Sequence, residues 1–142
     1  MKPHTLILTV GLPKSGKTTW AKQSIHPVVN PDAIRLALHG QAFVKMAEPM
    51  VWAIAETMVR HHFEYGYSTV ILDATNLTPE RREKWRSADW GTKFVVFDTR
   101  FATCRSRAEK SGFPVEVLDR MYASMILPGR DSFDVVQWIE ED

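Results

Sequence analysis

The chain contains a single cysteine, Cys104, among its 142 residues. One cysteine excludes an intramolecular disulfide and a cysteine-based zinc cluster, and it fits a reducing compartment, so we expect a cytoplasmic protein. The chain also lacks a large excess of positive or negative charge, because it has 18 lysines and arginines and 17 aspartates and glutamates. A net charge of +1 excludes a surface that wraps a long nucleic acid, although one strand end could still be bound locally.

Long hydrophobic runs, repeats and low-complexity linkers are lacking as well. The apolar run at residues 6–10 is too short to span a membrane, and we interpret it as a core strand rather than a signal peptide. With 44% hydrophobic and 25% charged residues, the composition is ordinary for a globular chain of this length. We therefore expect one domain with a single core and no membrane association. The sequence leaves the oligomeric state open.

Apolar β-branched segments alternate with segments of helical spacing. Strands are predicted at residues 5–10, 28–30, 69–73 and 93–98. Helices are predicted at residues 17–24, 32–38, 47–65, 78–88, 102–110 and 115–126. In the longest helix the apolar residues near helical spacing are Met50, Ile54 and Met58 and, less regularly, Trp52, Val59 and Phe63. The tail at 133–139 could be a strand or a short helix. The alternation predicts a parallel α/β sheet.

Residues 11–18, GLPKSGKT, directly follow the first predicted strand and match the phosphate-binding pattern G-x-x-x-x-G-K-[ST]. Such a glycine-containing loop points successive backbone N–H groups at an anion. Lys17 is expected to reach the β- and γ-phosphates of ATP or another nucleoside triphosphate, and the Thr18 hydroxyl to bind Mg²⁺. The residues expected to contact the nucleotide are Gly11, Leu12, Pro13, Lys14, Ser15, Gly16, Lys17, Thr18 and Thr19.

Acidic and basic residues follow the second and third predicted strands, at the edge where parallel sheets bind ligands. Asp73 stands where P-loop proteins carry an acidic residue linked to Mg²⁺; the alternative is that it only terminates the strand. Asp32 and Arg35 lie three residues apart, on one helix face. Asp32 could accept the proton of an attacking hydroxyl and Arg35 could hold an anionic acceptor, or the two could form a plain surface ion pair.

Four motifs occur in the order in which the kinase domain of bacteriophage polynucleotide kinase carries them. They are GLPKSGKTTW at 11–20, NPDAIR at 30–35, DATNLTPERR at 73–82 and VLDRMYASM at 117–125. The chain resembles this family from residue 6 to about 125. The resemblance implies one P-loop kinase domain over residues 1–142, with helices flanking a parallel sheet of four to five strands. The implied strand order is 2-3-1-4, possibly with a fifth strand, and a helical lid is implied at about residues 100–115.

The resemblance also implies an activity, namely Mg²⁺-dependent transfer of the γ-phosphate of ATP to the 5′-hydroxyl of DNA or RNA. Asp32 would be the general base, and Arg35 would contact the 3′-phosphate of the acceptor and help to hold Asp32. Thr75 and Asn76 would lie beside the acceptor. In the lid, Arg107 aligns with an arginine of the family. The next family arginine falls on Ser111, so this shortened lid departs from the family and leaves Lys110 as the substitute. Two alternatives stay open: a P-loop kinase for a nucleoside, sugar or antibiotic, and a regulatory nucleotide-binding module without turnover.

The motif that ends the third predicted strand departs from the family, and a basic helix follows it. The bacteriophage enzyme reads S-D-T-N where this chain reads D-A-T-N, so Asp73 is displaced by one position. In a strand this displacement would place its side chain on the opposite face, unless the strand has already ended. The helix at 78–88 is basic and could contact the acceptor backbone or be a solvated face. Its cations are Arg81, Arg82, Lys84 and Arg86.

Overall fold

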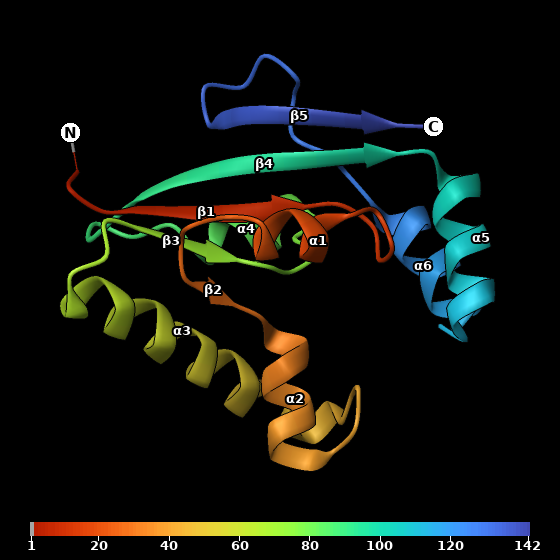
Figure 1. Ribbon diagram of the computed structural model, residues 1–142, viewed down its shortest axis with the longest axis horizontal. Coiled ribbons are helices and arrows are strands. Elements are labelled where there is room, and N and C mark those ends of the chain that lie inside the picture. Colours follow the sequence, from red (N-terminus) through yellow and green to blue (C-terminus); the bar gives the residue numbers. More distant parts are fainter. Residues whose placement is uncertain (1) are drawn as a thin grey trace.

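The computed structural model describes residues 2–142 and is drawn in Figure 1. Over these residues the chain forms a five-stranded parallel sheet in the order β2-β3-β1-β4-β5. The strands are β1 (Thr5–Val10), β2 (Val28–Val29), β3 (Thr69–Leu72), β4 (Gly91–Thr99) and β5 (Val135–Glu141). The predicted parallel sheet and strand order are confirmed. The tail is the edge strand β5, which pairs with β4 and so adds the fifth strand.

Six α-helices and one short 3-10 helix, η1, flank the sheet in the described part of the chain. They are α1 (Lys17–Lys22), α2 (Pro31–His39), η1 (Lys45–Ala47), α3 (Glu48–Tyr65), α4 (Pro79–Glu83), α5 (Phe101–Ser111) and α6 (Val115–Ser124). Figure 1 shows α5 and α6 together beyond the carboxyl end of β4, whereas α2 and α3 lie on the side of β2. Within residues 2–142, no helix is long and apolar enough to cross a lipid bilayer.

Two helices begin with a capping side chain followed by proline, as the sequence predicts. The Asn30 side chain accepts a hydrogen bond from the backbone N–H of Ala33 at the start of α2. The Thr78 hydroxyl likewise accepts from the N–H of Arg81 at the start of α4. Each cap satisfies a backbone donor that has no partner inside the helix. These caps fix where α2 and α4 leave the carboxyl ends of β2 and β3.

Helix α4 ends at Glu83, well before the predicted end near residue 88. After Lys84 the α-helical pattern is lost, because the N–H groups of Trp85 and Arg86 donate to carbonyls three residues back, on Arg82 and Glu83. The Trp85 carbonyl accepts hydrogen bonds from the Trp90 indole N–H and the Thr92 hydroxyl. Trp85 and Trp90 are buried, so the chain turns back to start β4 instead of continuing the helix.

The buried face of α3 agrees only in part with the predicted one: Val59 and Phe63 are buried as expected, whereas the burial of Val51 and Ala55 is not predicted. Val51, Ala55 and Val59 are fully buried in the main core, whereas Met50 is 58% exposed. The prediction for Met50 is therefore wrong, although Ile54 and Met58 still pack partly against the core. The physical reason is size: the valine and alanine side chains let α3 approach β3 more closely than a row of methionines would. This packing holds the first turn of α3 against the site described below.

Candidate active site

The loop between β1 and α1 has the backbone geometry of an anion-binding nest. Lys14 and Gly16 have positive φ angles of 70° and 104°. Alternation of left-handed and right-handed residues turns successive N–H groups to one side. Gly11 is required by space, because a Cβ at this position would lie 2.9 Å from the carbonyl oxygen of Phe97. The Thr99 hydroxyl, at the end of β4, donates to the Ser15 carbonyl at 2.9 Å and ties the loop to the sheet.

Lys17 is buried within this loop. Its Nζ donates to the Leu12 carbonyl at 2.5 Å and to the Ser15 hydroxyl at 3.4 Å. Burial lowers the pKa of Lys17 to about 8, and the negative charge of Asp73 opposes that shift. The hydrogen bonds and the charge of Asp73 therefore do not fully compensate the charged lysine for its loss of water. A phosphate group in the loop would supply the missing negative charge.

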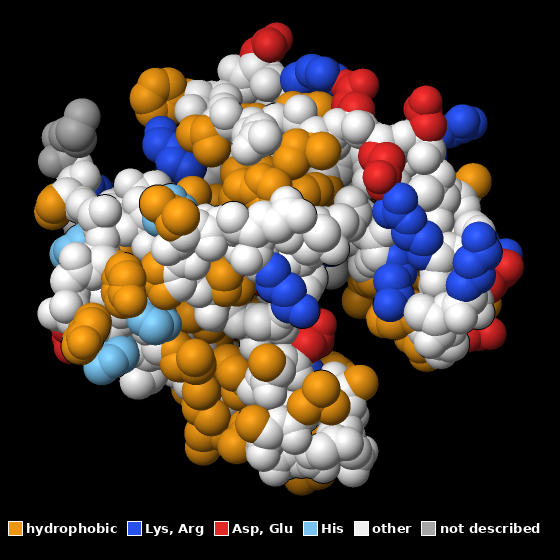
Figure 2. All heavy atoms as spheres, viewed as in Figure 1, with side chains coloured by type: hydrophobic (Ala, Val, Ile, Leu, Met, Phe, Trp, Pro, Cys, Tyr) orange, Lys and Arg blue, Asp and Glu red, His pale blue; other side chains and the backbone are white. Residues whose placement is uncertain are grey.

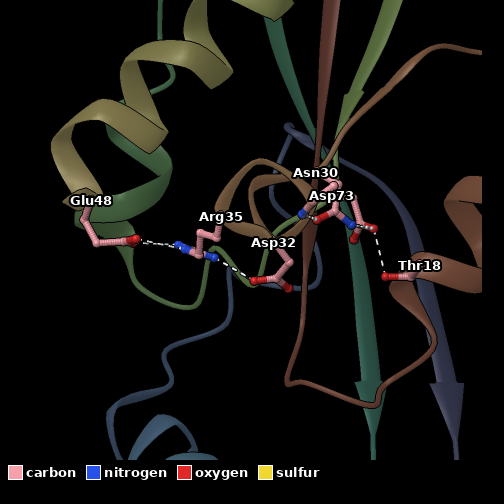
Figure 3. A network of polar contacts seen from close by, with 7 residues as sticks. Thr18, Asn30, Asp32, Arg35, Glu48 and Asp73 are labelled. Carbon is pink, nitrogen blue, oxygen red and sulfur yellow. Dashed lines mark hydrogen bonds and ion pairs between the residues drawn. The ribbon is translucent and has the colours of Figure 1, made fainter. Parts of the chain in front are cut away.

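Asp73 faces the loop and joins two other polar side chains (Figure 3). Its Oδ2 accepts hydrogen bonds from the Thr18 hydroxyl at 2.9 Å and from the Asn30 amide at 3.0 Å. Because β3 ends at Leu72, Asp73 no longer follows the alternation of the strand. The displacement by one position relative to the bacteriophage enzyme therefore does not turn the carboxylate away. Asn30 both caps α2 and orients Asp73, a second role that the sequence does not announce.

The Thr18 and Asp73 side chains offer the kind of ligands that Mg²⁺ accepts. Both present oxygen atoms, and they lie within hydrogen-bond distance of each other. Mg²⁺ in phosphate-transfer sites takes one or two protein oxygens and completes its shell with water and phosphate. In the described chain no cluster of three or more His, Cys, Asp or Glu residues could hold a metal by itself. The donor set thus fits a Mg²⁺ ion that arrives with a nucleotide.

Asp32 and Arg35 form an ion pair that continues to a third residue, Glu48 (Figure 3). Arg35 Nη1 donates to Asp32 Oδ1 at 2.7 Å. Its Nε and Nη2 donate to the two carboxylate oxygens of Glu48, at 2.9 and 2.7 Å. These bonds raise the pKa of Arg35 and lower the pKa of Glu48, each through the side-chain hydrogen bonds first. Asp32 is 79% exposed and keeps its second oxygen open to the cleft.

Sequence reasoning did not find Glu48. It lies in the first turn of α3, where an acidic residue is ordinarily explained by the helix dipole. Nothing in the pattern relates it to Arg35, thirteen residues earlier. The pairing arises only because α2 and α3 pack against each other. Both oxygens of Glu48 fix the plane of the guanidinium, and that plane directs Nη1 toward Asp32.

We expect Glu48→Gln to lower kcat for phosphoryl transfer about tenfold, because loss of a residue that orients a functional side chain typically costs at least that much. The KM for ATP should stay unchanged, since Glu48 lies away from the P-loop. Steady-state kinetics with varied ATP measure both. Glu56→Gln, an exposed glutamate on the same helix that pairs with Arg60, is the matched control. Equal kcat values for the two variants would show that Glu48 does not position Arg35.

The P-loop and the Asp32–Arg35–Glu48 group line one large cleft of about 1420 Å³. Figure 2 shows it as a hollow between the lobe that carries α2 and the lobe that carries α5 and α6. The predicted site residues that line this cleft are Pro13, Lys14, Ser15, Gly16, Lys17, Thr18, Thr19, Asp32, Arg35, Asp73, Thr75, Asn76 and Arg107. Gly11 and Leu12 are buried beneath the loop, and Lys110 is exposed outside the lining.

Thr75 and Asn76 lie where β3 gives way to the segment before α4. The Thr75 carbonyl accepts the N–H of Gly11 at 3.0 Å, and the Asn76 amide donates to the Thr9 carbonyl at 2.8 Å. Asn76 is buried and adopts a positive φ of 45°. Its amide group is thus already used to hold this segment against β1. Contact with an acceptor stays a prediction for both residues.

Arg107, on α5, reaches the P-loop from the other side of the cleft. Its Nη1 donates to the Lys14 carbonyl at 2.9 Å and pairs with Glu141 of β5 at 2.7 Å. The bond to Glu141 raises the pKa of Arg107. Lys110, one turn further along α5, makes no such contact and stays a prediction. Glu141 is a second residue that sequence reasoning does not find, because it lies beyond the tail predicted at 133–139 and joins the sheet as the last residue of β5.

Arg82, on α4, is buried beneath the cleft and acts as an internal support. Its Nη1 donates to the Asn76 carbonyl and its Nη2 to the Ile126 carbonyl, both at 2.9 Å. Burial lowers the pKa of this guanidinium, and within residues 2–142 no carboxylate forms an ion pair with it. The two bonds tie the last turn of α4 to the segment that precedes it and to the segment after α6.

We expect Arg82→Ala to reduce the free energy of unfolding by about 2–4 kcal/mol, because a buried and a partly buried carbonyl lose a charged donor. Lys84→Ala, an exposed position just past the same helix, should change it by less than about 0.5 kcal/mol. Urea unfolding followed by circular dichroism measures both. Equal midpoints for the two variants would contradict the supporting role of Arg82.

Comparison with known proteins agrees with this geometry at the level of the fold. The chain is similar to a gluconokinase from Sinorhizobium meliloti, with 18% identity, a TM-score of 0.65, and 99% of this chain and 84% of that one covered. The APS kinase CysC of Mycobacterium tuberculosis gives 18% identity, a TM-score of 0.62 and coverage of 100% and 91%. A chain of the Pnkp1/Rnl/Hen1 RNA repair complex gives 20% identity and a TM-score of 0.70, with 87% of this chain and 44% of that one covered.

These likenesses, all below 25% identity, show that the chain has the P-loop kinase fold. The resemblance seen in the sequence is confirmed to that extent, and the similar structures include kinases with different substrates. A family model described as "AAA domain" matches residues 6–128, which include the P-loop, Asp32 and the Thr18–Asp73 pair. The chain therefore belongs to this AAA domain family.

Proposed function

We propose that the protein transfers the γ-phosphate of ATP to the 5′-hydroxyl of a DNA or RNA strand. The observation that carries this proposal is the exposed Asp32 carboxylate, held by Arg35 in the same cleft as Lys17 and the Thr18–Asp73 pair. A base must face both the acceptor and the phosphate to promote transfer. The chain would act as one kinase domain over residues 1–142, with a lid at about residues 100–115.

The chain's own residues divide the work. The P-loop amides and Lys17 bind the triphosphate and stabilise the charge that develops during transfer. Asp32 takes the proton of the attacking hydroxyl, whose oxygen forms the new bond to phosphorus while the bond to the β-phosphate oxygen breaks. Arg35 and Glu48 keep Asp32 oriented. Thr18 and Asp73 would hold Mg²⁺, which neutralises charge on the phosphates when bound.

The lid assignment rests on Arg107. It already contacts the carbonyl of Lys14, so its guanidinium lies at the mouth of the P-loop. A nucleotide phosphate could replace Glu141 as the ion-pair partner of Arg107, because a guanidinium binds phosphate and carboxylate oxygens in the same way. Lys110 would serve only after a movement of α5.

A polynucleotide suits the acceptor side of the cleft for two reasons. The lining of the cleft also includes Phe43, Trp52, Arg81 and Arg120, which supply aromatic faces and cations. These are the side chains that bind bases and phosphates of single strands. One of the similar structures is a chain of an RNA repair complex. Because this chain corresponds to 44% of that one, the likeness lends support to the kinase portion of the proposal alone.

A small-molecule kinase is the second candidate, and the Arg35–Glu48 pair favours it. A guanidinium bound on two sides by carboxylates is less available to a 3′-phosphate than the bacteriophage resemblance implies. Carboxylates also bind the hydroxyls of a sugar well. Two of the similar structures are kinases of small molecules by name, a gluconokinase and an APS kinase.

The deciding experiment offers labelled ATP and Mg²⁺ together with 5′-hydroxyl DNA and RNA oligonucleotides, nucleosides and gluconate. We expect label on an oligonucleotide with wild-type protein and none with Asp32→Ala or Lys17→Met. Label on a nucleoside or on gluconate alone would support the second candidate instead. ATP binding without transfer to any acceptor would favour a regulatory module.

A further inference from the structure

Arg35 has few hydrogen-bond donors left for an acceptor. Its Nε and Nη2 are bound by Glu48 and its Nη1 by Asp32. A guanidinium carries five N–H groups in a planar fork, and a bidentate carboxylate occupies one side of that fork. Two carboxylates around one guanidinium also leave the local charge negative. A phosphate on the acceptor would therefore need another cation on this wall of the cleft.

The cations of the basic segment at 78–88 differ in their surroundings. Arg82 is the buried support, and Arg86 is held by two acidic side chains. Lys84 is exposed and does not line the cleft. Arg81 is exposed and lines the cleft, and in the described chain its guanidinium forms no ion pair. Among these four cations, Arg81 is therefore the one that both lines the cleft and keeps its N–H donors open to a ligand.

Trp52 determines where the Arg81 guanidinium lies. The Cζ of Arg81 is 5.8 Å from the centroid of the Trp52 ring, and the Cζ of Arg35 is 5.7 Å from it. Stacking of this kind restrains a guanidinium without using its N–H groups. Hydrogen bonds from Arg35 lower the pKa of Glu48 first, and the charge of Arg81 adds the smallest contribution. Arg81 is thus close to the ion pair that holds Asp32.

The backbone beneath Arg81 is fixed as well. Arg82 ties the last turn of α4 to two carbonyls, and Thr78 caps the helix by accepting from the N–H of Arg81 itself. A short helix anchored in this way presents its first turn in one orientation. The side chain of Arg81 is exposed and lies beside Trp52 in the cleft lining.

We propose that Arg81, supported by Trp52, binds a phosphate of the acceptor beside the hydroxyl that Asp32 deprotonates. The inference rests on the proposed function and names the group that the site recognises. It assigns Arg35 to the positioning of Asp32 and makes Arg81 the residue that selects phosphate-bearing acceptors. The preferred acceptor carries a 3′-phosphate or phosphodiester on the same nucleotide as its 5′-hydroxyl. A neutral nucleoside or sugar offers nothing to the fork of Arg81.

The test uses two acceptors that differ only in the phosphate, adenosine 3′-monophosphate and adenosine, with the intact chain. Arg81→Ala should lower kcat/KM for the phosphorylated acceptor about 10–100-fold, mainly through KM, as expected for a lost charged hydrogen bond. For adenosine the same variant should change kcat/KM less than about twofold. Lys84→Ala removes a nearby cation that does not line the cleft and should change neither value. Thermal unfolding of all three proteins verifies that the fold is kept.

Equal losses on both acceptors in Arg81→Ala, or no loss on either, would overturn the role of Arg81 and leave the kinase proposal intact. A loss as large in Lys84→Ala would do the same, because it would point to long-range charge rather than a contact. If the wild-type protein phosphorylates adenosine or a sugar but neither the 3′-monophosphate nor an oligonucleotide, the proposed function fails and this inference fails with it.

Discussion

Asp32→Ala is expected to lower kcat for phosphoryl transfer by about 10²–10⁴-fold, the usual contribution of a general base. Affinity for ATP should stay near that of the wild type, because the carboxylate contacts Arg35 and no part of the P-loop. The protein should also stay folded. Asp32 is 79% exposed, and Arg35 keeps both oxygens of Glu48 as partners when Asp32 is removed. The variant should therefore lower the rate of transfer without changing ATP affinity or the fold.

Single-turnover transfer of labelled phosphate and fluorescent-nucleotide binding measure the two effects. Asp32→Asn sharpens the comparison, because the amide can still accept from Arg35 but cannot take a proton. Glu116→Ala is the matched control: it removes an exposed acidic residue from the first turn of another helix, α6, outside the cleft lining. A parallel fall in transfer and ATP affinity in Asp32→Ala would mean that Asp32 has a structural role. Full activity of Asp32→Asn would exclude it as the base.

The parts of the site that could be predicted depend on local signals. The P-loop is encoded in eight consecutive residues, and the caps at Asn30 and Thr78 are encoded in their own turns. Asp73 could be placed because a carboxylate that directly follows a buried strand has to emerge at the carboxyl edge of the sheet. Such features need few residues, and those residues are neighbours in the chain.

The parts that could not be predicted depend on packing between distant segments. Glu48 meets Arg35 only through the contact of α2 with α3, and Glu141 meets Arg107 only because β5 joins the sheet. Helix α3 buries Val51 and Ala55 together with Val59, and of these three the hydrophobic pattern indicates only Val59. The basic segment is the clearest case. Of its four cations, Arg82 is a buried support, Arg81 lines the cleft, and Lys84 and Arg86 lie on the surface. No local sequence pattern distinguishes these roles.

Lys17→Met is expected to abolish transfer while leaving the free protein at least as stable as the wild type. Removing a cation that stabilises the transferring phosphate should cost about 10³-fold or more in kcat/KM for ATP. Burial lowers the pKa of Lys17 to about 8, so the charged form is disfavoured in the fold. Methionine keeps the length of the apolar stem and removes that charge. Lys22→Met, an exposed lysine on the same helix, is the control and should retain activity.

The difference in free energy of unfolding between Lys17→Met and the wild type should depend on pH. A lysine whose pKa is lower in the folded state costs folding free energy when both states are protonated, which here is below about pH 8. Between pH 8 and the ordinary value of 10.5 the folded protein releases its proton first, and the cost fades. The advantage of Lys17→Met in urea unfolding without nucleotide should therefore be largest at pH 7 and shrink above pH 8. A variant less stable than the wild type at pH 7 would show that the bond from Nζ to the Leu12 carbonyl outweighs the burial of charge.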